Sequence, residues 1–158
     1  MEIRFADSRD IPGIIDLLQQ VGEVHHQIRP DLFRAGAQKY DEAALAQLLL
    51  DKTRPIFIAE ENGAVLGYAF CILQITQNDP VLCDWKVLYI DDLCVDEKMR
   101  GRGIAGALYQ KVCAYAGELG CDAVTLNVWC GNDSALRFYE RQGLKPRNIH
   151  MEMRLEDN

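Results

Sequence analysis

The spacing of apolar residues divides the first third of the chain into a strand and two helices. Polar and apolar residues alternate over Glu2–Ala6, which predicts a strand, and apolar residues then recur at helical spacing over Ile11–Val21. A second run with helical spacing, Ala44–Leu49, follows the N-cap candidate Asp41. Between the helices a proline, a glycine and two adjacent histidines interrupt any regular period. Gly22–Tyr40 is therefore predicted to be an irregular connection.

The middle of the chain has the pattern of a β-hairpin followed by a further strand. Ile56–Glu60 and Ala64–Ile75 are rich in β-branched and aromatic residues, which favour strands. The dipeptide Asn62-Gly63 between them favours the tight turn of a hairpin, so the two segments are predicted to pair antiparallel. Trp85–Val95 has a similar composition and is predicted to be another strand.

A glycine-rich turn follows this strand and leads directly into a helix. Three glycines occur within Arg100–Gly106, where the missing Cβ atoms leave the backbone amides free to turn toward one ligand. Apolar residues then recur at helical spacing as far as Leu119, and Gly120 suits a left-handed C-terminal cap. A helix N-terminus favours an anion because its N–H groups are unpaired and its dipole is positive there, and Arg100 and Arg102 add charge. The turn therefore predicts a site for a phosphate or pyrophosphate.

The C-terminal part of the chain predicts two more strands and a short helix. Ala123–Trp129 is strand-like, and it must run parallel to Trp85–Val95 because a helix connects the two. A short helix is predicted to begin at Asn132 and to stop at Gly143. Ile149–Leu155 alternates apolar and polar residues as a last strand.

Length, charge and cysteine content narrow the range of functions. The 158 residues are expected to form one domain, residues 1–158. The net charge of −7, from 24 acidic and 17 basic residues, disfavours nucleic acid and anionic membranes and favours a cationic small molecule. With no apolar run long enough to span a bilayer and no leader pattern at the N-terminus, the expected location is cytoplasmic. Six scattered cysteines without metal-ligand spacing predict no metal site.

Two motifs in this sequence are shared with a known family. Arg100–Ala105 satisfies a turn written as Arg or Gln, two free positions, Gly, one free position, then Gly or Ala. Asn132 is followed by a helix containing Phe138-Tyr139 and by a closing Gly143. In order and spacing the chain resembles the GNAT superfamily of N-acetyltransferases, which move an acetyl group from acetyl-coenzyme A (acetyl-CoA) to an amine. The resemblance implies an α/β fold with a mixed, mostly antiparallel sheet of six or seven strands, helices on both faces and a splayed central parallel pair.

The resemblance also implies where the cosubstrate binds. The pyrophosphate would lie on the backbone amides of the glycine turn, and the pantetheine arm would pair with the backbone of the preceding strand like an extra strand. The far end of that arm would contact the start of the last helix. The implied contacts are Leu93, Cys94, Val95, Arg100, Gly101, Arg102, Gly103, Ile104, Ala105, Gly106, Asn132 and Ala135.

Two residues carry the implied chemistry. Tyr139 would stand near the thioester sulfur and protonate the departing thiolate, and Asp91 would help to deprotonate the amine, directly or through water. In a regular strand Asp92 would point to the opposite face. Without the resemblance, Tyr139 would be read as a core aromatic and both aspartates as ordinary charges on a strand.

Several functional alternatives stay open at this stage. A glycine-rich turn also opens dinucleotide-binding units, but here the strand before it lies deep in the chain. Within the family, the acceptor could be a small cationic amine, or a protein N-terminus or lysine. A noncatalytic module that binds acyl-CoA is a third possibility, and Tyr139 and the complete turn argue against it. A homodimer is expected because members of the family often pair through terminal strands.

Overall fold

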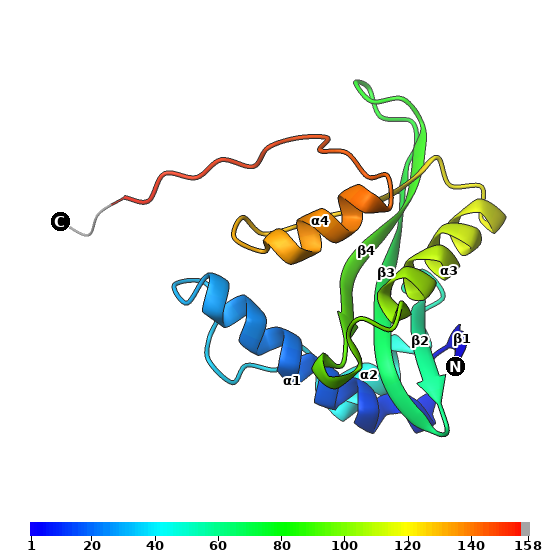
Figure 1. Ribbon diagram of the computed structural model, residues 1–158. Helices are drawn as coiled ribbons and strands as arrows, with labels where there is room; N and C mark the ends of the chain where they lie inside the picture. The colour runs from blue at the N-terminus through cyan, green and yellow to red at the C-terminus, as the bar shows by residue number, and fades with distance from the viewer. Residues whose placement is uncertain (156–158) are drawn as a thin grey trace.

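The core of the protein is a mixed five-stranded sheet with the order β1-β2-β3-β4-β5 (Figure 1). The computed structural model describes residues 1–155. Its strands are β1 Glu2–Phe5, β2 Ile56–Glu61, β3 Ala64–Thr76, β4 Trp85–Val95 and β5 Ala123–Leu126. All neighbouring strands pair antiparallel except β4 and β5, which are parallel. The mixed, mostly antiparallel sheet is confirmed, but the predicted count of six or seven strands is wrong.

The missing strand is the predicted C-terminal one. Ile149–Leu155 has no strand pairing, and its polar side chains instead form ion pairs with the segment after α1: Glu152 with Arg29 at 2.6 Å and Arg154 with Asp31 at 3.6 Å. The four apolar side chains of the segment are at least 80% exposed. Alternation therefore identified an extended segment, but it carried no information on whether a neighbouring strand was available. Homodimerisation stays a prediction, which sedimentation can test.

The helices are α1 Ile11–Ile28, α2 Glu42–Leu48, α3 Ile104–Glu118 and α4 Asp133–Arg141. The prediction that Gly22–Tyr40 is irregular was wrong in its first part, because α1 continues to Ile28. Gly22 does not break the helix. A Cβ atom there would lie 2.8 Å from the Ala37 carbonyl oxygen, so this glycine lets the returning chain approach α1 closely. The two histidines are helical as well, and the His25 ring stacks on Phe33 at a centroid distance of 5.0 Å.

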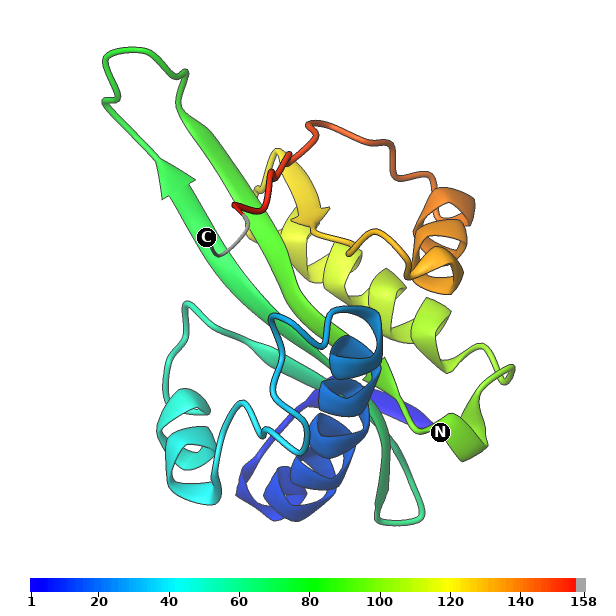
Figure 2. The same ribbon diagram turned by 90° about the vertical axis from the view of Figure 1, so that its left-hand side faces the viewer.

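Helices cover both faces of the sheet, as predicted (Figure 2). One face packs against α1 and α2 in a buried cluster formed by Ile11, Ile14, Leu17, Leu18, Leu45, Leu48, Ile56, Ile58, Tyr68, Phe70 and Cys94. The other face packs against α3 in a second cluster formed by Phe57, Ala59, Leu66, Ala69, Cys71, Leu88, Ile90, Ile104, Leu108, Val112 and Ala116. Because both faces of the central strands are buried, side chains on β4 are held firmly between the two helical layers.

The turns confirm the local predictions. Asn62 and Gly63 both have positive φ, 54° and 83°, as the hairpin between β2 and β3 requires. Gly120 takes φ 66° just after α3 and Gly143 takes φ 92° just after α4.

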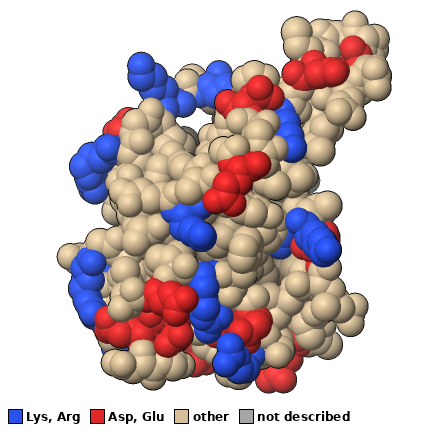
Figure 3. All heavy atoms as spheres, turned by 90° about the vertical axis from the view of Figure 1, so that its right-hand side faces the viewer, with Lys and Arg blue, Asp and Glu red and all other residues tan. Residues whose placement is uncertain are grey.

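On the surface, acidic and basic side chains lie interspersed on the face shown in Figure 3, rather than gathered by sign. Among the described residues, no helix has the length and apolarity needed to cross a membrane.

Alanine in place of Asp10 is expected to lower the free energy of unfolding by about 1.5 to 3 kcal/mol. Asp10 is 5% exposed, and its carboxylate accepts hydrogen bonds from Arg4 at 2.8 and 2.9 Å and from the Asp7 backbone N–H at 2.8 Å. Urea unfolding followed by circular dichroism measures the change. Arg9→Ala removes an ion pair at a side chain that is 80% exposed, and it serves as the control with no measurable effect expected. Equal losses in the two variants would contradict the prediction.

Candidate active site

The glycine turn joins β4 to α3 with an open, left-handed backbone. After a short 3₁₀ turn over Glu97–Met99, Gly101 and Gly103 both have φ 78°, and Gly103 is the N-cap of α3. A Cβ atom built on Gly101, Gly103 or Gly106 would meet no atom within 4 Å. The space beside these amides is therefore free, which fits the predicted cradle for a phosphate group. Ile104 is 2% exposed, so its side chain belongs to the core. Only its backbone could contact a phosphate bound at the turn.

The two arginines of the turn have different surroundings. Arg102 forms an ion pair with Glu61 at 3.0 Å, so part of its charge is already compensated. Arg100 is exposed and lines a surface hollow of about 1020 Å³ between α1 and the turn. Within residues 1–155 no salt bridge involves Arg100. Of the two, Arg100 has the charge that is more available to an anion.

β4 and β5 pair over only part of their length, which leaves one edge of β4 open. The parallel register runs from Val87 opposite Ala123 to Ile90 opposite Leu126, and β5 then ends. The predicted strand over Ala123–Trp129 is thus shorter than expected. The chain turns away to place the Trp129 ring 5.4 Å from that of Phe33. The splayed parallel pair is confirmed, but it is not central as predicted, because β5 is the last strand of the described sheet.

Leu93, Cys94 and Val95 lie on the part of β4 beyond the splay. On the other side they pair with β3, opposite Ala69, Tyr68 and Gly67 respectively. The Cys94 thiol is buried and points toward α1, at 3.7 Å from the Leu17 carbonyl oxygen, and burial raises its pKa to about 12. Cys94 is therefore a core side chain, and a ligand on the open edge would meet backbone groups.

A β-bulge changes the directions of the two acidic side chains on β4. Asp92 is opposite Phe70 and Ile90 is opposite Cys71, so Asp91 is an extra residue without a partner in the register. The expectation that Asp91 and Asp92 point to opposite faces assumed a regular strand, and it is wrong. The bulge places both carboxylates on the face that α1 and the segment after it cover.

The contacts of the two carboxylates show this shared placement. Asp91 accepts a hydrogen bond from Lys39 Nζ at 2.6 Å, and Lys39 belongs to the segment between α1 and α2. Asp92 accepts a hydrogen bond from the hydroxyl of Tyr68 at 2.8 Å, and Tyr68 is fully buried in the cluster under α1. Loss of solvent contact raises the pKa of Asp92, although Tyr68 and the charge of Lys39 oppose the shift.

Tyr139 has a buried position on α4, where the charge of Asp92 acts on it. The tyrosine is 9% exposed, and its ring lies 6.3 Å from that of Tyr109 on α3. Burial raises the pKa of Tyr139 well above its usual value, and the negative charge of Asp92 raises it further. The hydroxyl therefore keeps its proton at neutral and mildly alkaline pH, which is the state that a general acid needs.

Asn132 and Ala135 have a structural role at the start of α4. The Asn132 side-chain oxygen accepts hydrogen bonds from the Ala135 backbone N–H and from the Ser134 hydroxyl, both at 3.2 Å. Asn132 is thus the N-cap that fixes the beginning of the helix carrying Tyr139. Contacts of either residue with a cosubstrate stay a prediction.

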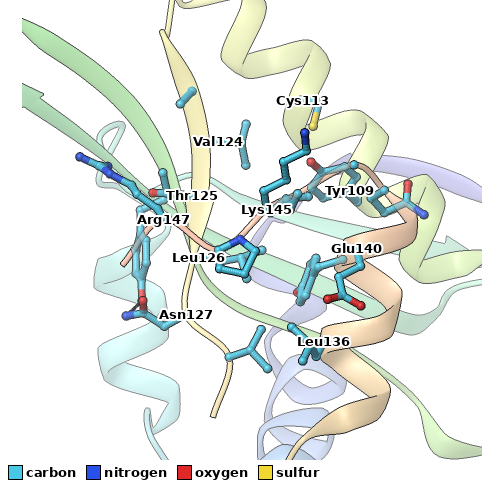
Figure 4. A pocket seen from close by; sticks show the side chains of 18 of the residues that line it. Tyr109, Cys113, Val124, Thr125, Leu126, Asn127, Leu136, Glu140, Lys145 and Arg147 are labelled. Carbon is cyan, nitrogen blue, oxygen red and sulfur yellow. Dashed lines mark hydrogen bonds between the residues drawn. The ribbon is translucent and has the colours of Figure 1, made fainter. Parts of the chain in front are cut away.

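A second hollow, of about 1010 Å³, lies beside Tyr139 along β5 (Figure 4). The labelled side chains of α3, β5 and α4 surround it, with Lys145 and Arg147 from the segment after α4. Tyr89 of β4 also lines it and accepts a hydrogen bond from the Asn127 side-chain amide at 3.2 Å. Of the predicted site residues, only Tyr139 lines this hollow. Of the same set, only Arg100 lines the hollow between α1 and the glycine turn. The open edge of β4 lies between these two regions.

Two polar residues of the site escaped the sequence analysis. Lys39 falls in the segment without any recognisable pattern, so no signal pointed to it. Tyr68 lies in a segment with the composition of an ordinary strand, so nothing marked it as a site residue. The antiparallel pairing of β3 with β4 places Tyr68 on the strand next to the one that carries Asp92. No group of three or more His, Cys, Asp or Glu side chains arranged to hold a metal is found within the described residues.

Comparisons with known proteins agree on one family. The model of the acetyltransferase (GNAT) family matches residues 22–144. An uncharacterized N-acetyltransferase of Bacillus subtilis is 31% identical over 143 residues, which are 90% of this chain and 89% of that protein. A mouse thialysine N-epsilon-acetyltransferase is 24% identical over 144 residues, 90% of this chain and 81% of that protein. An uncharacterized N-acetyltransferase of Methanocaldococcus jannaschii is matched over only 40% of its length, at 32% identity over 100 residues.

A solved structure gives the same result for the fold. A mutant protein from Bacillus halodurans superposes with a TM-score of 0.94 at 29% identity, covering 99% of this chain and all of that one. The family match includes β4, the glycine turn, α3, β5 and α4, which are the elements that build the site described above. This chain therefore belongs to the GNAT acetyltransferase family.

Proposed function

We propose that the protein is an acetyl-CoA-dependent N-acetyltransferase that acetylates a primary amine of a small, cationic acceptor. One observation carries this proposal. On β4 an open backbone edge leads in one direction to the glycine turn and in the other to two carboxylates, with the protonated hydroxyl of Tyr139 nearby. These are the groups that acetyl transfer to an amine requires.

The cosubstrate would bind along this edge. Amides of Gly101–Gly106 would hold the pyrophosphate at the positive end of α3, and Arg100 would add charge from the side. The pantetheine arm would form backbone hydrogen bonds with Leu93–Val95, because the splay leaves that edge of β4 without a strand. The thioester would then lie toward the bulge, between the acidic side chains and Tyr139.

The chemistry follows from the needs of the reaction. A neutral amine attacks the thioester carbonyl, the carbonyl oxygen gains negative charge, and the sulfur leaves as a thiolate. A backbone N–H on the open edge of β4 can stabilise the oxyanion without reorganisation, because a fixed dipole is already oriented. Tyr139 is the proposed acid for the sulfur. Asp91, directly or through water, is the proposed base, and Asp92 next to it in the chain adds a second carboxylate on the same face.

Asparagine in place of Asp92 is expected to change the acidic side of the pH profile of turnover. The pKa of Asp92 is raised, so its carboxyl is protonated already at a higher pH than an ordinary aspartate. In the wild type, turnover should fall as pH decreases through this raised pKa, because the negative charge that Asp92 adds beside the proposed base, and that attracts the acceptor ammonium, is lost. Asp92→Asn should be slower than the wild type above the pKa of Asp92, where the wild-type carboxylate is charged, and should lack that step.

The matched variant Asp91→Asn separates the two carboxylates. If Asp91 is the base, its replacement should impair amine use most at low pH, where less amine arrives deprotonated. Profiles of kcat against pH for both variants, with the same amine, measure the difference. An unchanged profile in Asp91→Asn would restrict that aspartate to holding Lys39 or steering the acceptor. An unchanged profile in Asp92→Asn would show that the charge of Asp92 does not affect turnover through the pKa of Tyr139.

The choice of a cationic acceptor rests on charge. Two carboxylates on one face attract an ammonium group, and the net charge of −7 steers cations toward the protein. The mouse relative is named for an amine, thialysine, and this supports the same class of acceptor. A protein N-terminus or lysine is the alternative within the family. A noncatalytic acyl-CoA-binding module is less well supported, because it has no need for the protonated Tyr139.

A screen of amines tests the proposal directly. Purified protein is incubated with acetyl-CoA and polyamines, aminoglycoside-like compounds, amino acid derivatives or peptides, and the release of free CoA thiol is followed. Turnover with small cationic amines is the expected result. Turnover with peptides alone would favour the protein acceptor, and binding of acetyl-CoA without any turnover would favour the noncatalytic module.

A further inference from the structure

The structure places one amine of the protein itself at the bulge of β4. Lys39 Nζ lies 2.6 Å from Asp91 Oδ2, and 5.6 Å from the centroid of the Tyr40 ring. Within residues 1–155 it is the only one of the six lysines that forms an ion pair. Its side chain is 44% exposed, so it rests on the carboxylate without being locked in the core. The amine thus occupies a position that an acceptor ammonium would take beside the proposed base.

We propose that Lys39 is a self-acetylation site, whose ε-amine takes an acetyl group from acetyl-CoA bound to the same subunit. The proposal rests on the proposed function, because it uses the same donor and the same base. It adds an acceptor that belongs to the chain. The ion pair holds Nζ close to the reacting region, and this proximity replaces the capture of a second molecule from solution.

The step balances without any further reagent. The Lys39 ammonium gives one proton to the Asp91 carboxylate, and the neutral Nζ attacks the carbonyl carbon of the thioester. The N–C bond forms, the nitrogen releases its second proton to water, the C–S bond breaks, and the sulfur takes a proton from the Tyr139 hydroxyl, which solvent then restores. The products are one Nε-acetyl-lysine and free CoA. Because the hydrogen bond to Asp91 also stabilises the ammonium, the reaction is expected to be slow and to stop after one event per chain.

Acetylation would change the site that it uses. The product is a neutral amide, so the ion pair between Lys39 and Asp91 is lost and the carboxylate is free to meet an external ammonium. Self-acetylation is therefore expected to increase the affinity for cationic acceptors. A lag in turnover that shortens after preincubation with acetyl-CoA is the kinetic sign of this change.

Mass spectrometry of the purified protein tests the proposal. After incubation with acetyl-CoA, the intact mass should increase by one acetyl group, and peptide mapping should place it on Lys39. The first-order rate should be independent of protein concentration, and modification of Lys39 should exceed that of the exposed Lys52 by at least about a hundredfold. Tyr139→Phe should slow it by at least tenfold, as a passive chemical reaction would not.

Two conservative variants provide the controls. Lys39→Arg keeps the charge beside Asp91 but cannot be acetylated, and it should lose the first mass increase, whereas Lys52→Arg should retain it. Labelling of Lys39 no faster than Lys52, or at a rate proportional to protein concentration, would overturn the proposal. If external amines release CoA while Lys39 stays unmodified, the self-acetylation proposal fails and the acetyltransferase function stands. If neither reaction occurs, both fail.

Discussion

Valine in place of Gly103 is expected to abolish measurable binding of acetyl-CoA. Gly103 has φ 78°, a conformation that a β-branched residue adopts only at a cost of about 1–3 kcal/mol. A Cβ atom there would project into space that is empty of protein atoms, so the side chain would occupy the room proposed for the phosphates. Both effects oppose a close approach of the pyrophosphate to the amides of the turn. Calorimetry of acetyl-CoA binding measures the loss.

A glycine beyond the other end of α3 provides the matched control. Gly120, just beyond the other end of the helix, has φ 66° and equally free space around a built Cβ atom. Gly120→Val should destabilise the fold by a similar amount and leave acetyl-CoA binding intact. Arg100→Ala should weaken binding only a few-fold, because a solvated charge contributes less than the amides around it. Near-normal binding by Gly103→Val would show that the phosphates do not lie on this turn.

The sequence was informative wherever structure is determined by neighbours along the chain. The hairpin at Asn62-Gly63, the strand Trp85–Val95 and the caps at Gly120 and Gly143 depend on local backbone preferences, and all have the predicted structure. The same holds for the unit formed by β4, the glycine turn and α3, because a helix that joins two strands fixes them as parallel. These local signals were sufficient to place the proposed phosphate site.

The remaining features depend on contacts between distant segments. The irregular connection was predicted to begin at Gly22, but α1 continues through it, and the close approach of Ala37 explains a glycine at this position. The bulge at Asp91 inserts one residue into β4 and reverses the expected direction of one carboxylate, and no composition pattern marks it. Lys39 reaches the site across 52 residues of sequence, through a segment without periodicity. Tertiary packing decides each of these cases.

Phenylalanine in place of Tyr139 is expected to lower turnover by about 100- to 10,000-fold. The variant loses only the hydroxyl, so the ring still packs against Tyr109 and acetyl-CoA binding should be almost unchanged. Burial raises the pKa of Tyr139, and the hydroxyl is protonated at any pH below its raised pKa. It therefore stays available as a proton donor throughout neutral and mildly alkaline pH. The wild-type rate should therefore show no alkaline decline from this group, and the variant should be slow over the same range.

Measurements of kcat against pH, with the best amine of the screen, test the role of this hydroxyl. Tyr115→Phe is the control, because it also removes one tyrosine hydroxyl from the protein, while its ring packs between Phe5 and Phe57 at the far end of α3. The control should turn over like the wild type. A loss confined to Tyr139→Phe, with KM for acetyl-CoA unchanged, places the missing interaction in the transition state, where the leaving sulfur needs a proton. Wild-type rates for Tyr139→Phe at every pH would instead mean that the thiolate leaves unassisted, and that the ring serves only to close the hollow beside β5.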